Sequence, residues 1–402
     1  MHTLNSGTSP SAVRPDRRLD WLDNLRIALT VLVVVHHAAQ PYGPDDWWYV
    51  EGQPRTPGLA TLSAVDGAFF MSLFFFVSAA FVPSSYQRHG AWRFLKSRMV
   101  RLGIPVVVGA LTIVPGLMYT YYVHYRGYPP ISFPRYFWDV YLGLAEKPAG
   151  WTGPSWPDLQ FGHLWFIQNL LAYTVLYVIC SRVGRLLQRP RRDERVRGER
   201  PAPGHGALLW LTAAITAATL LIRLRYPLDK WIPVLDFLQV EPARVPQYAA
   251  FFTLGVLAHR HHWLERFDAR IGWVWLGVGL AAVASLFAMG ADSDWFAPGG
   301  FNGPALAWAA YDSALCVSLC VGLLTLFRET VTSTSRLSKE LAADSYGVYI
   351  LHVPLVVTVQ NYLTGRNLSA IGAWATSSVL AIGTAFALAA GLRRLPGVRR
   401  VL

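Results

Sequence analysis

The feature that most constrains this chain is the recurrence of apolar runs close to 20 residues long. A helix of about 20 apolar residues spans the hydrocarbon core of a bilayer. The 402 residues are 53% hydrophobic and only 15% charged, and the mean hydropathy is +0.30. These values predict an all-α integral membrane protein with a single bundle of about ten transmembrane helices. The ten candidate spans are approximately 25–43, 59–83, 103–123, 163–181, 206–222, 245–258, 271–290, 303–327, 344–363 and 371–392.

The distribution of basic residues supports this topology. When the N-terminus is placed in the cytoplasm, most of the 36 Lys and Arg fall in the cytoplasmic connections. Cytoplasmic loops carry the excess of positive charge in membrane proteins, so both termini are expected inside. We therefore expect a multi-pass protein of the inner (plasma) membrane. The net charge of +12 indicates contact with anionic lipid or an anionic cofactor, and nucleic acid is not expected as a partner.

Three segments stand apart from the membrane domain, which is predicted over 20–395. Residues 1–19 are polar and are predicted to form a disordered cytoplasmic tail. The outer loop 124–162 is rich in aromatic residues, Pro and Gly, so we expect it to lie on the membrane surface or over a cavity mouth. The cytoplasmic loop 182–205 is strongly basic, which the topology alone can explain.

The first apolar stretch, residues 22–43, carries ionisable groups that are costly in a membrane and hence suggest function. Arg26 and His37 are eleven residues apart, close to three helical turns, so they share one helix face about 16 Å apart. Asp23 lies one turn before Arg26, whereas His36 is rotated away from this face. The structural alternative is a snorkelling arginine and a hydrogen-bonded helix histidine.

Further candidates lie at the ends of later spans. Arg98 and Arg101 are three residues apart at the cytoplasmic start of the third span, where they could bind phosphate or simply set the topology. In the ninth span, His352 follows Tyr349 by about one turn and precedes Pro354, which loosens the helix. A buried, satisfied histidine is the alternative there.

Two more side chains, His163 and Trp165, open the fourth span at the outer face, where a Trp is usually an anchor. Asp66 and Asp312 fall within spans and are expected as charge partners for buried Arg or His. The three cysteines have no metal-ligand spacing, so no metal site is predicted. The chain has no G-x-S-x-G, H-E-x-x-H or P-loop motif, which disfavours an elbow serine hydrolase, a zincin and an NTPase.

Taken in order, these stretches resemble acyltransferase family 3. The matching stretches are Asp23, Arg26 and His37; Phe70–Phe81 with Ala79 in place of the usual Gly; Arg98 and Arg101; HLWF at 163–166; YAAFFTLGVLAHR at 248–260; and SYGVYILHVP at 345–354. The resemblance covers about 20–395 and is close to the branch that contains the glucan succinyltransferase.

The resemblance implies an O-acyltransferase that moves an acyl group, such as acetyl or succinyl, from cytoplasmic acyl-CoA to a hydroxyl. The acceptor would be a cell-envelope glycan, a lipid or a secondary metabolite, and no cofactor would be bound permanently. The expected catalytic residues are His37, Arg26 and His352; the expected donor-binding residues are Arg98, Arg101 and Arg26; the expected substrate-binding residues are Trp165, His163 and Tyr349.

Other functions fit parts of the pattern. A transporter or exporter could use the intramembrane Arg, His and Asp as a substrate or proton path. An inactive relative that serves as a scaffold is a third possibility. An enzyme transfers label from radiolabelled acyl-CoA to an acceptor, whereas transport persists without acyl-CoA.

Overall fold

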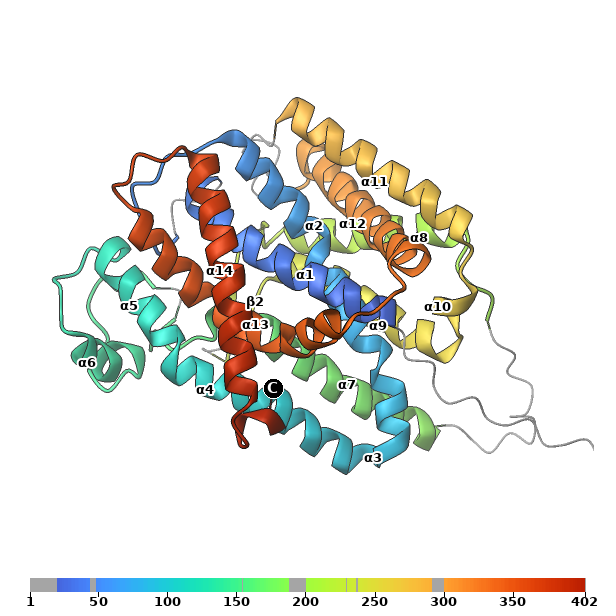
Figure 1. Ribbon diagram of the computed structural model, residues 1–402, viewed down its shortest axis with the longest axis horizontal. Coiled ribbons are helices and arrows are strands. Elements are labelled where there is room, and N and C mark those ends of the chain that lie inside the picture. Colours follow the sequence, from blue (N-terminus) through green and yellow to red (C-terminus); the bar gives the residue numbers. More distant parts are fainter. Residues whose placement is uncertain are drawn as a thin grey trace, which may run out of the picture.

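The structure is a computed structural model that describes residues 20–43, 48–153, 155–187, 200–228, 230–235, 238–290 and 300–401. The predicted disordered tail, residues 1–19, lies outside the described residues, as does 188–199 within the basic loop 182–205. Figure 1 shows helices throughout the chain, with α8 and α11 toward one side and α4 and α5 toward the other.

The helices occur where the apolar runs predicted them. Among the described residues, nine helical segments are long and apolar enough to cross a membrane, which confirms an all-α membrane architecture except for one small hairpin. The segments are Asp20–Tyr42 (α1, η1), Pro57–Ala80 (α2), Val82–Tyr125 (α3, η2, α4, α5), Gly162–Leu186 (η4, α7), His205–Arg223 (α8), Ala269–Met289 (α11), Gly303–Thr330 (α12), Arg336–Leu363 (α13) and Ala370–Arg393 (α14).

The predicted span 245–258 is helical but short. It corresponds to α9 (Val245–Arg260), which has 16 residues and is about 24 Å long, less than the roughly 30 Å of a hydrocarbon core. The predicted span 103–123 is also only part of a longer element. Val82–Tyr125 has 44 residues, comprising α3 (Val82–Arg98), a π-helical turn η2 (Met99–Gly103), α4 (Ile104–Thr112) and α5 (Val114–Tyr125). The sides on which the termini lie stay a prediction.

The centre of the bundle is built from helices α1, α2, α12 and α13. α1 (Asp20–Ala39) packs against α2, α12, α13 and α14. Most of α2 is buried, whereas only a small part of α8, α11 or α14 is. Figure 1 shows α1, α2 and α12 beside one another in the middle of the molecule. Thr30 of α1 and His352 and Gln360 of α13 therefore lie in the interior rather than against lipid.

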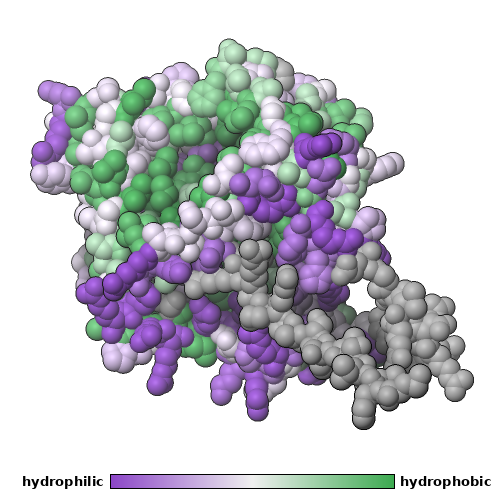
Figure 2. Space-filling view, turned by 45° about the vertical axis from the view of Figure 1, so that its right-hand side comes forward, coloured by the Kyte–Doolittle hydropathy of each residue, from purple (hydrophilic) through white to green (hydrophobic). Residues whose placement is uncertain are grey.

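The surface has the pattern of a membrane protein. Figure 2 shows hydrophobic side chains over the upper part of one face and hydrophilic side chains gathered along its lower edge. Soluble monomers rarely expose contiguous apolar areas of this kind, whereas a bilayer covers them.

One departure from an all-α fold lies between α8 and α9. Strands β1 (Ile232–Val234) and β2 (Leu238–Val240) pair antiparallel, with Ile232 opposite Val240 and Val234 opposite Leu238. The β-branched residues of this segment favour extended backbone. The 3-10 turn η6 (Pro242–Arg244) then leads directly into α9.

The aromatic segment 124–162 folds onto itself through buried polar contacts. It contains α6 (Phe133–Arg135), the π-helical η3 (Tyr136–Tyr141) and the start of η4 (Gly162–Leu164). Asp158 accepts hydrogen bonds from Arg126 Nη2 at 2.9 Å and from the Tyr136 hydroxyl at 2.8 Å. Burial raises the pKa of Asp158 to about 6, although both partners oppose this shift. The Tyr141 hydroxyl donates to Ala110 O at 2.5 Å and so attaches this segment to α4.

The helices α2 and α9 approach so closely that a glycine is required. A Cβ at Gly255 would lie 2.3 Å from the backbone oxygen of Phe76 and 2.9 Å from Ala79 Cβ. We predict that Gly255→Ala lowers the stability of the detergent-solubilised protein by about 1–3 kcal/mol, because backbone atoms must move to admit the methyl group. A thermal unfolding midpoint measures this effect. Gly67→Ala is the matched control, since a Cβ at Gly67 meets nothing within 4 Å; equal midpoints would contradict the prediction.

Candidate active site

Two histidines that are 315 residues apart in the chain meet between α1 and α13. His352 Nε2 lies 3.2 Å from His37 Nδ1, and the two ring centroids are 4.8 Å apart. His352 is fully buried, whereas His37 is only partly covered. The pairing of α1 with α13 thus brings together two side chains that the sequence analysis had selected separately.

Backbone carbonyls fix the proton positions on both rings. His37 Nδ1 lies 2.9 Å from Val33 O, and His352 Nδ1 lies 2.7 Å from Tyr349 O. A carbonyl only accepts, so in each neutral ring Nδ1 carries the hydrogen and Nε2 keeps the lone pair. The lone pair of His352 Nε2 can then accept from His37 Nδ1. This arrangement leaves His37 Nε2 as a base.

A third histidine joins this cluster through the proline of α13. Pro354 has no N–H and cannot bond to the carbonyl of Ile350, four residues earlier. His163 Nε2 lies 2.9 Å from that carbonyl oxygen and donates to it. The rings of His163 and His352 are 5.5 Å apart. His163 Nδ1 is buried and has no hydrogen-bond partner among the described residues, so it remains an acceptor.

Tyr349 belongs to the same cluster, but Trp165 does not. The Tyr349 hydroxyl donates to the His163 backbone oxygen. Trp165 stacks on Tyr248, with 5.6 Å between ring centroids, and contacts Trp231 at 5.3 Å. The structure therefore brings three of the predicted site residues close to His37 and places Trp165 in a separate aromatic group.

His36 faces α2 rather than the His37–His352 pair, as its rotation predicted. His36 Nδ1 lies 3.7 Å from Asp66 Oδ2, and Gln40 Nε2 donates to His36 Nε2 at 3.0 Å. Asp66 is buried, so this histidine is the partner that the sequence analysis expected for an intramembrane carboxylate. The His36 and His37 rings lie 5.3 Å apart, so His36 stands between the Asp66 carboxylate and His37.

Trp48 and Gln360 border the cluster and were missed by sequence reasoning. The Trp48 ring lies 5.9 Å from the His37 ring, and its Nε1 donates to Gln360 Oε1 at 2.7 Å. Gln360 Nε2 donates in turn to Ala38 O at 3.1 Å. A signal for Gln360 existed, because a buried amide within an apolar span needs partners. Trp48 lies in a short connection whose sequence carries no such signal.

The predicted arginines lie away from the histidines. Arg26 Nη2 donates to Ala342 O at 2.8 Å and lies 3.4 Å from Asp23 Oδ1. The Arg98 guanidinium packs over the Phe94 ring at 5.1 Å. Arg101 lies beside α13, where the Tyr346 hydroxyl donates to the Arg101 backbone oxygen at 2.6 Å.

Arg101 also lines a basic cavity of about 320 Å³ that does not include Arg98. We call this the basic cavity; its lining residues are Arg93, Lys96, Ser97, Val100, Arg101 and Arg400. Four cationic side chains in one small cavity suit a phosphorylated ligand. Arg400 could not be foreseen, because it comes from the other end of the chain.

Comparison with known proteins decides what kind of enzyme this geometry belongs to. Residues 19–392 match the family model described as "Acyltransferase domain". The chain belongs to the acyltransferase 3 family. This membership identifies a multi-pass membrane acyltransferase and gives the transporter alternative no support.

Distant curated relatives agree with the family. The acyltransferase is 24% identical over 391 residues to "Glucans biosynthesis protein C" of Salmonella gallinarum, covering 93% of this chain and 91% of that protein. It is 23% identical over 386 residues to the proteins of the same name from Salmonella schwarzengrund and Salmonella heidelberg, with the same coverage. No solved structure matches the chain.

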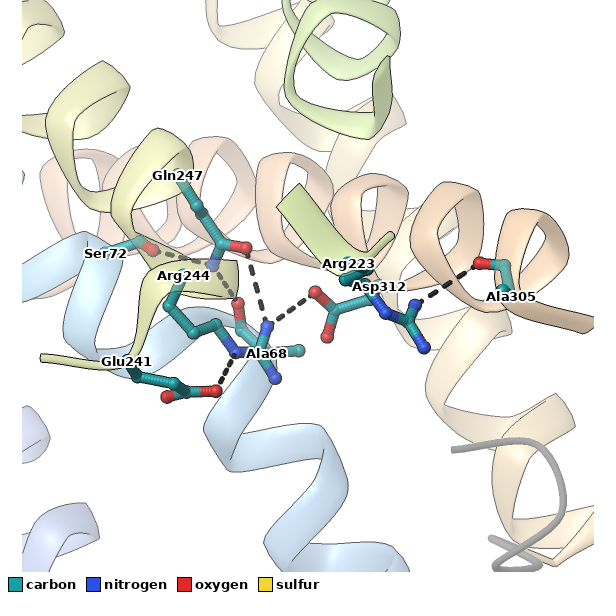
Figure 3. Close-up of polar contacts among 8 residues, drawn as sticks. All are labelled: Ala68, Ser72, Arg223, Glu241, Arg244, Gln247, Ala305 and Asp312. Carbon is teal, nitrogen blue, oxygen red and sulfur yellow. Dashed lines mark hydrogen bonds and ion pairs between the residues drawn. The ribbon is translucent and has the colours of Figure 1, made fainter. Parts of the chain in front are cut away.

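A second buried polar cluster holds the short α9 of the acyltransferase in place. Arg244 Nη1 lies 2.5 Å from Asp312 Oδ2 on α12, and Arg244 Nε lies 3.8 Å from Glu241 (Figure 3). Gln247 Nε2 donates to Ala68 O at 2.6 Å and to Ser72 Oγ at 2.8 Å on α2. Asp312 is thus the partner of a buried Arg, as the sequence analysis expected.

We predict that the Arg244–Asp312 pair is needed for stability. Asp312→Asn removes the closest counter-charge from a buried guanidinium and should lower the stability of the acyltransferase by about 3 kcal/mol. Thermal unfolding in detergent measures this loss. Asp139→Asn is the control, because Asp139 pairs with Arg135 at an exposed site and such pairs contribute at most about 1 kcal/mol. A loss for Asp312→Asn no larger than for Asp139→Asn would refute the assignment.

Proposed function

We propose that this enzyme is an O-acyltransferase that moves an acyl group from cytoplasmic acyl-CoA to a hydroxyl of a cell-envelope glycan, lipid or secondary metabolite. The observation that carries the proposal is the His37–His352 pair, which leaves His37 Nε2 as a base inside the membrane domain. Family membership supports the acyl transfer. The proposal places the protein in the inner membrane with both termini in the cytoplasm.

Contacts along the length of α13 support a path through the membrane. Ala342 contacts Arg26, Tyr346 contacts Arg101, His352 contacts His37, and Gln360 contacts Trp48. Residues 342 and 360 are about 27 Å apart along the helix, close to the thickness of a hydrocarbon core. His352 is about 15 Å from the first and about 12 Å from the second. A donor that enters near Arg101 and an acceptor that enters near Trp48 would therefore meet at the histidines.

In the proposed reaction, His37 Nε2 takes the proton of the acceptor hydroxyl as its oxygen attacks the thioester carbonyl carbon. The carbon–oxygen bond forms, the carbon–sulfur bond breaks, and the proton passes from His37 to the departing thiolate of coenzyme A. A neutral imidazole can perform both transfers, because its unprotonated nitrogen accepts a proton and can then return it. No covalent acyl-enzyme is required.

The other histidines act through His37. His352 Nε2 accepts from His37 Nδ1, which keeps the proton of His37 on Nδ1 and orients the ring. His163 holds the α13 segment around Ile350, and its free Nδ1 can accept a hydrogen bond from substrate. Asp66, one residue beyond through His36, provides negative charge that favours the transient imidazolium.

We assign the basic cavity to the phosphates of coenzyme A. Its four cationic residues and its place beside Tyr346 of α13 support this assignment. Three arginines were expected to bind acyl-CoA, and of these Arg101 lines the basic cavity. Arg98 is adjacent and adds positive charge, and Arg26 is a positioning residue because it bonds the start of α13 through Ala342.

Among the acceptor classes we favour a glycan. The curated relatives carry the name "Glucans biosynthesis protein C", which favours a glycan among the three classes. The aromatic group of Trp165, Trp231 and Tyr248 offers flat faces of the kind that stack on sugar rings. Mass spectrometry of envelope glycans and lipids, with and without the gene, identifies the modified hydroxyl.

We predict that His37→Ala strongly lowers the rate of acyl transfer while leaving protein levels normal. Loss of a general base reduces turnover by about 10²–10⁴-fold. The assay follows label from radiolabelled acetyl-CoA or succinyl-CoA into the envelope fraction. His89→Ala is the matched control, because His89 is exposed on α3 and bonds only within its own helix. Wild-type product from His37→Ala at a normal protein level would rule out the proposed base.

For the basic cavity we predict that substitutions weaken the binding of acyl-CoA without changing the rate of acyl transfer. Arg400→Gln and Arg101→Gln should each raise the KM for acyl-CoA about tenfold with little change in kcat, since each removes a charge-assisted bond to phosphate. Arg399→Gln is the control, because Arg399 precedes Arg400 in the chain and does not line the cavity. A lowered kcat at unchanged KM, or equal effects at 399 and 400, would show that the donor binds elsewhere.

A further inference from the structure

A groove with a volume of about 650 Å³ lies between α3, α7 and α9. This size lies within the range of pockets that hold a small ligand. Its walls are mainly apolar, with Leu176 and Thr253 exposed to the outside of the bundle and Phe252 and Val256 buried behind them. The Tyr173 ring contacts Phe252 at 5.5 Å and forms part of the floor. A hydrocarbon chain fits such a lining.

One end of the groove is cationic. Arg185 of α7 donates to the Tyr86 hydroxyl, and Arg260 of α9 donates to the Tyr177 hydroxyl at 3.2 Å. The two tyrosine rings contact each other at 5.6 Å, so both guanidiniums belong to one cluster. In the described part of the chain, neither guanidinium is paired with a carboxylate. Each keeps N–H groups for an anion, because a guanidinium has five donors.

From these features we infer that the groove binds one anionic membrane phospholipid. Its phosphate lies between Arg185 and Arg260, and an acyl chain follows the apolar wall toward Tyr173. Basic pockets between transmembrane helices bind anionic lipid headgroups for this reason. The tyrosine hydroxyls accept hydrogen bonds from both arginines and so fix the guanidiniums at one end of the groove. This fixed pair of charges distinguishes the groove from the general apolar surface that any lipid covers.

The groove is separate from the proposed donor site. None of its lining residues lines the basic cavity, although α3 contributes to both. Gly90, at a φ of 71°, interrupts α3 between Tyr86 and Arg93. A lipid in the groove therefore does not occupy the place of the acyl-CoA phosphates, and the inference holds whichever acyl group the enzyme transfers.

The chain carries a natural reporter for this groove. Cys180 is exposed and lines the groove, whereas Cys316 and Cys320 are buried. In nanodiscs, a maleimide that partitions into the bilayer should label Cys180 several-fold more slowly with phosphatidylglycerol present than in phosphatidylcholine alone. Peptide mass spectrometry gives the rate at this residue. The same difference should be absent in a Cys180→Ala, Ile179→Cys protein, because Ile179 is exposed next to the groove but does not line it.

The arginines provide the decisive variants. Arg185→Gln combined with Arg260→Gln should remove the protection and reduce co-purifying phosphatidylglycerol, with about a fivefold loss of affinity per arginine. Arg182→Gln, on the same helix but outside the groove, should behave as wild type. Equal Cys180 labelling in both lipids, protection that survives the double variant, or protection by acyl-CoA in phosphatidylcholine alone would each overturn the inference. The two-lipid comparison on the wild-type protein decides the question even if the double variant folds poorly.

Discussion

In a bilayer, every polar group that leaves water must find its partner inside the protein, and this constraint governs the interior of the acyltransferase. His37 and His352 satisfy it with backbone carbonyls, and Arg244 satisfies it with Asp312. Carbonyl partners stabilise the helix pair, but they also determine which ring nitrogen carries a proton. The hydrogen bonds that satisfy the buried polar groups in the bilayer are therefore the same ones that leave an unprotonated nitrogen on His37.

The helix α13 relates the two ends of the proposed path. Its contact with Arg101 lies beside the basic cavity, and its contact with Trp48 through Gln360 lies toward the opposite end of the helix. The packing of α1 against α13 places the histidines between these ends. A membrane enzyme that joins substrates from two sides needs such an arrangement. Its reacting atoms must meet within the protein, where water from either side of the membrane does not reach freely.

Local sequence patterns predicted much of this arrangement. Apolar runs located the helices, and helical spacing placed Arg26 and His37 on one face and turned His36 away from it. The contact between His37 and His352 could not be derived in this way, because periodicity describes one helix and not its neighbours. The same limit explains why Arg400 was missed beside Arg101 and why Trp165 was grouped with His163. The predicted span 245–258 is the 16-residue helix α9, and its polar attachments through Arg244 to α12 and through Gln247 to α2 could not be read from an apolar run.

The proline of α13 has a consequence for how this site can change over evolutionary time. Pro354 leaves the Ile350 carbonyl without its helical partner, and His163 supplies the missing donor. If residue 354 regained an N–H, it would compete with His163 for that oxygen; if His163 were lost, the carbonyl would be left unsatisfied in the interior. Neither residue can be exchanged alone without cost. The two positions should therefore covary among related chains, although they are 191 residues apart in the sequence.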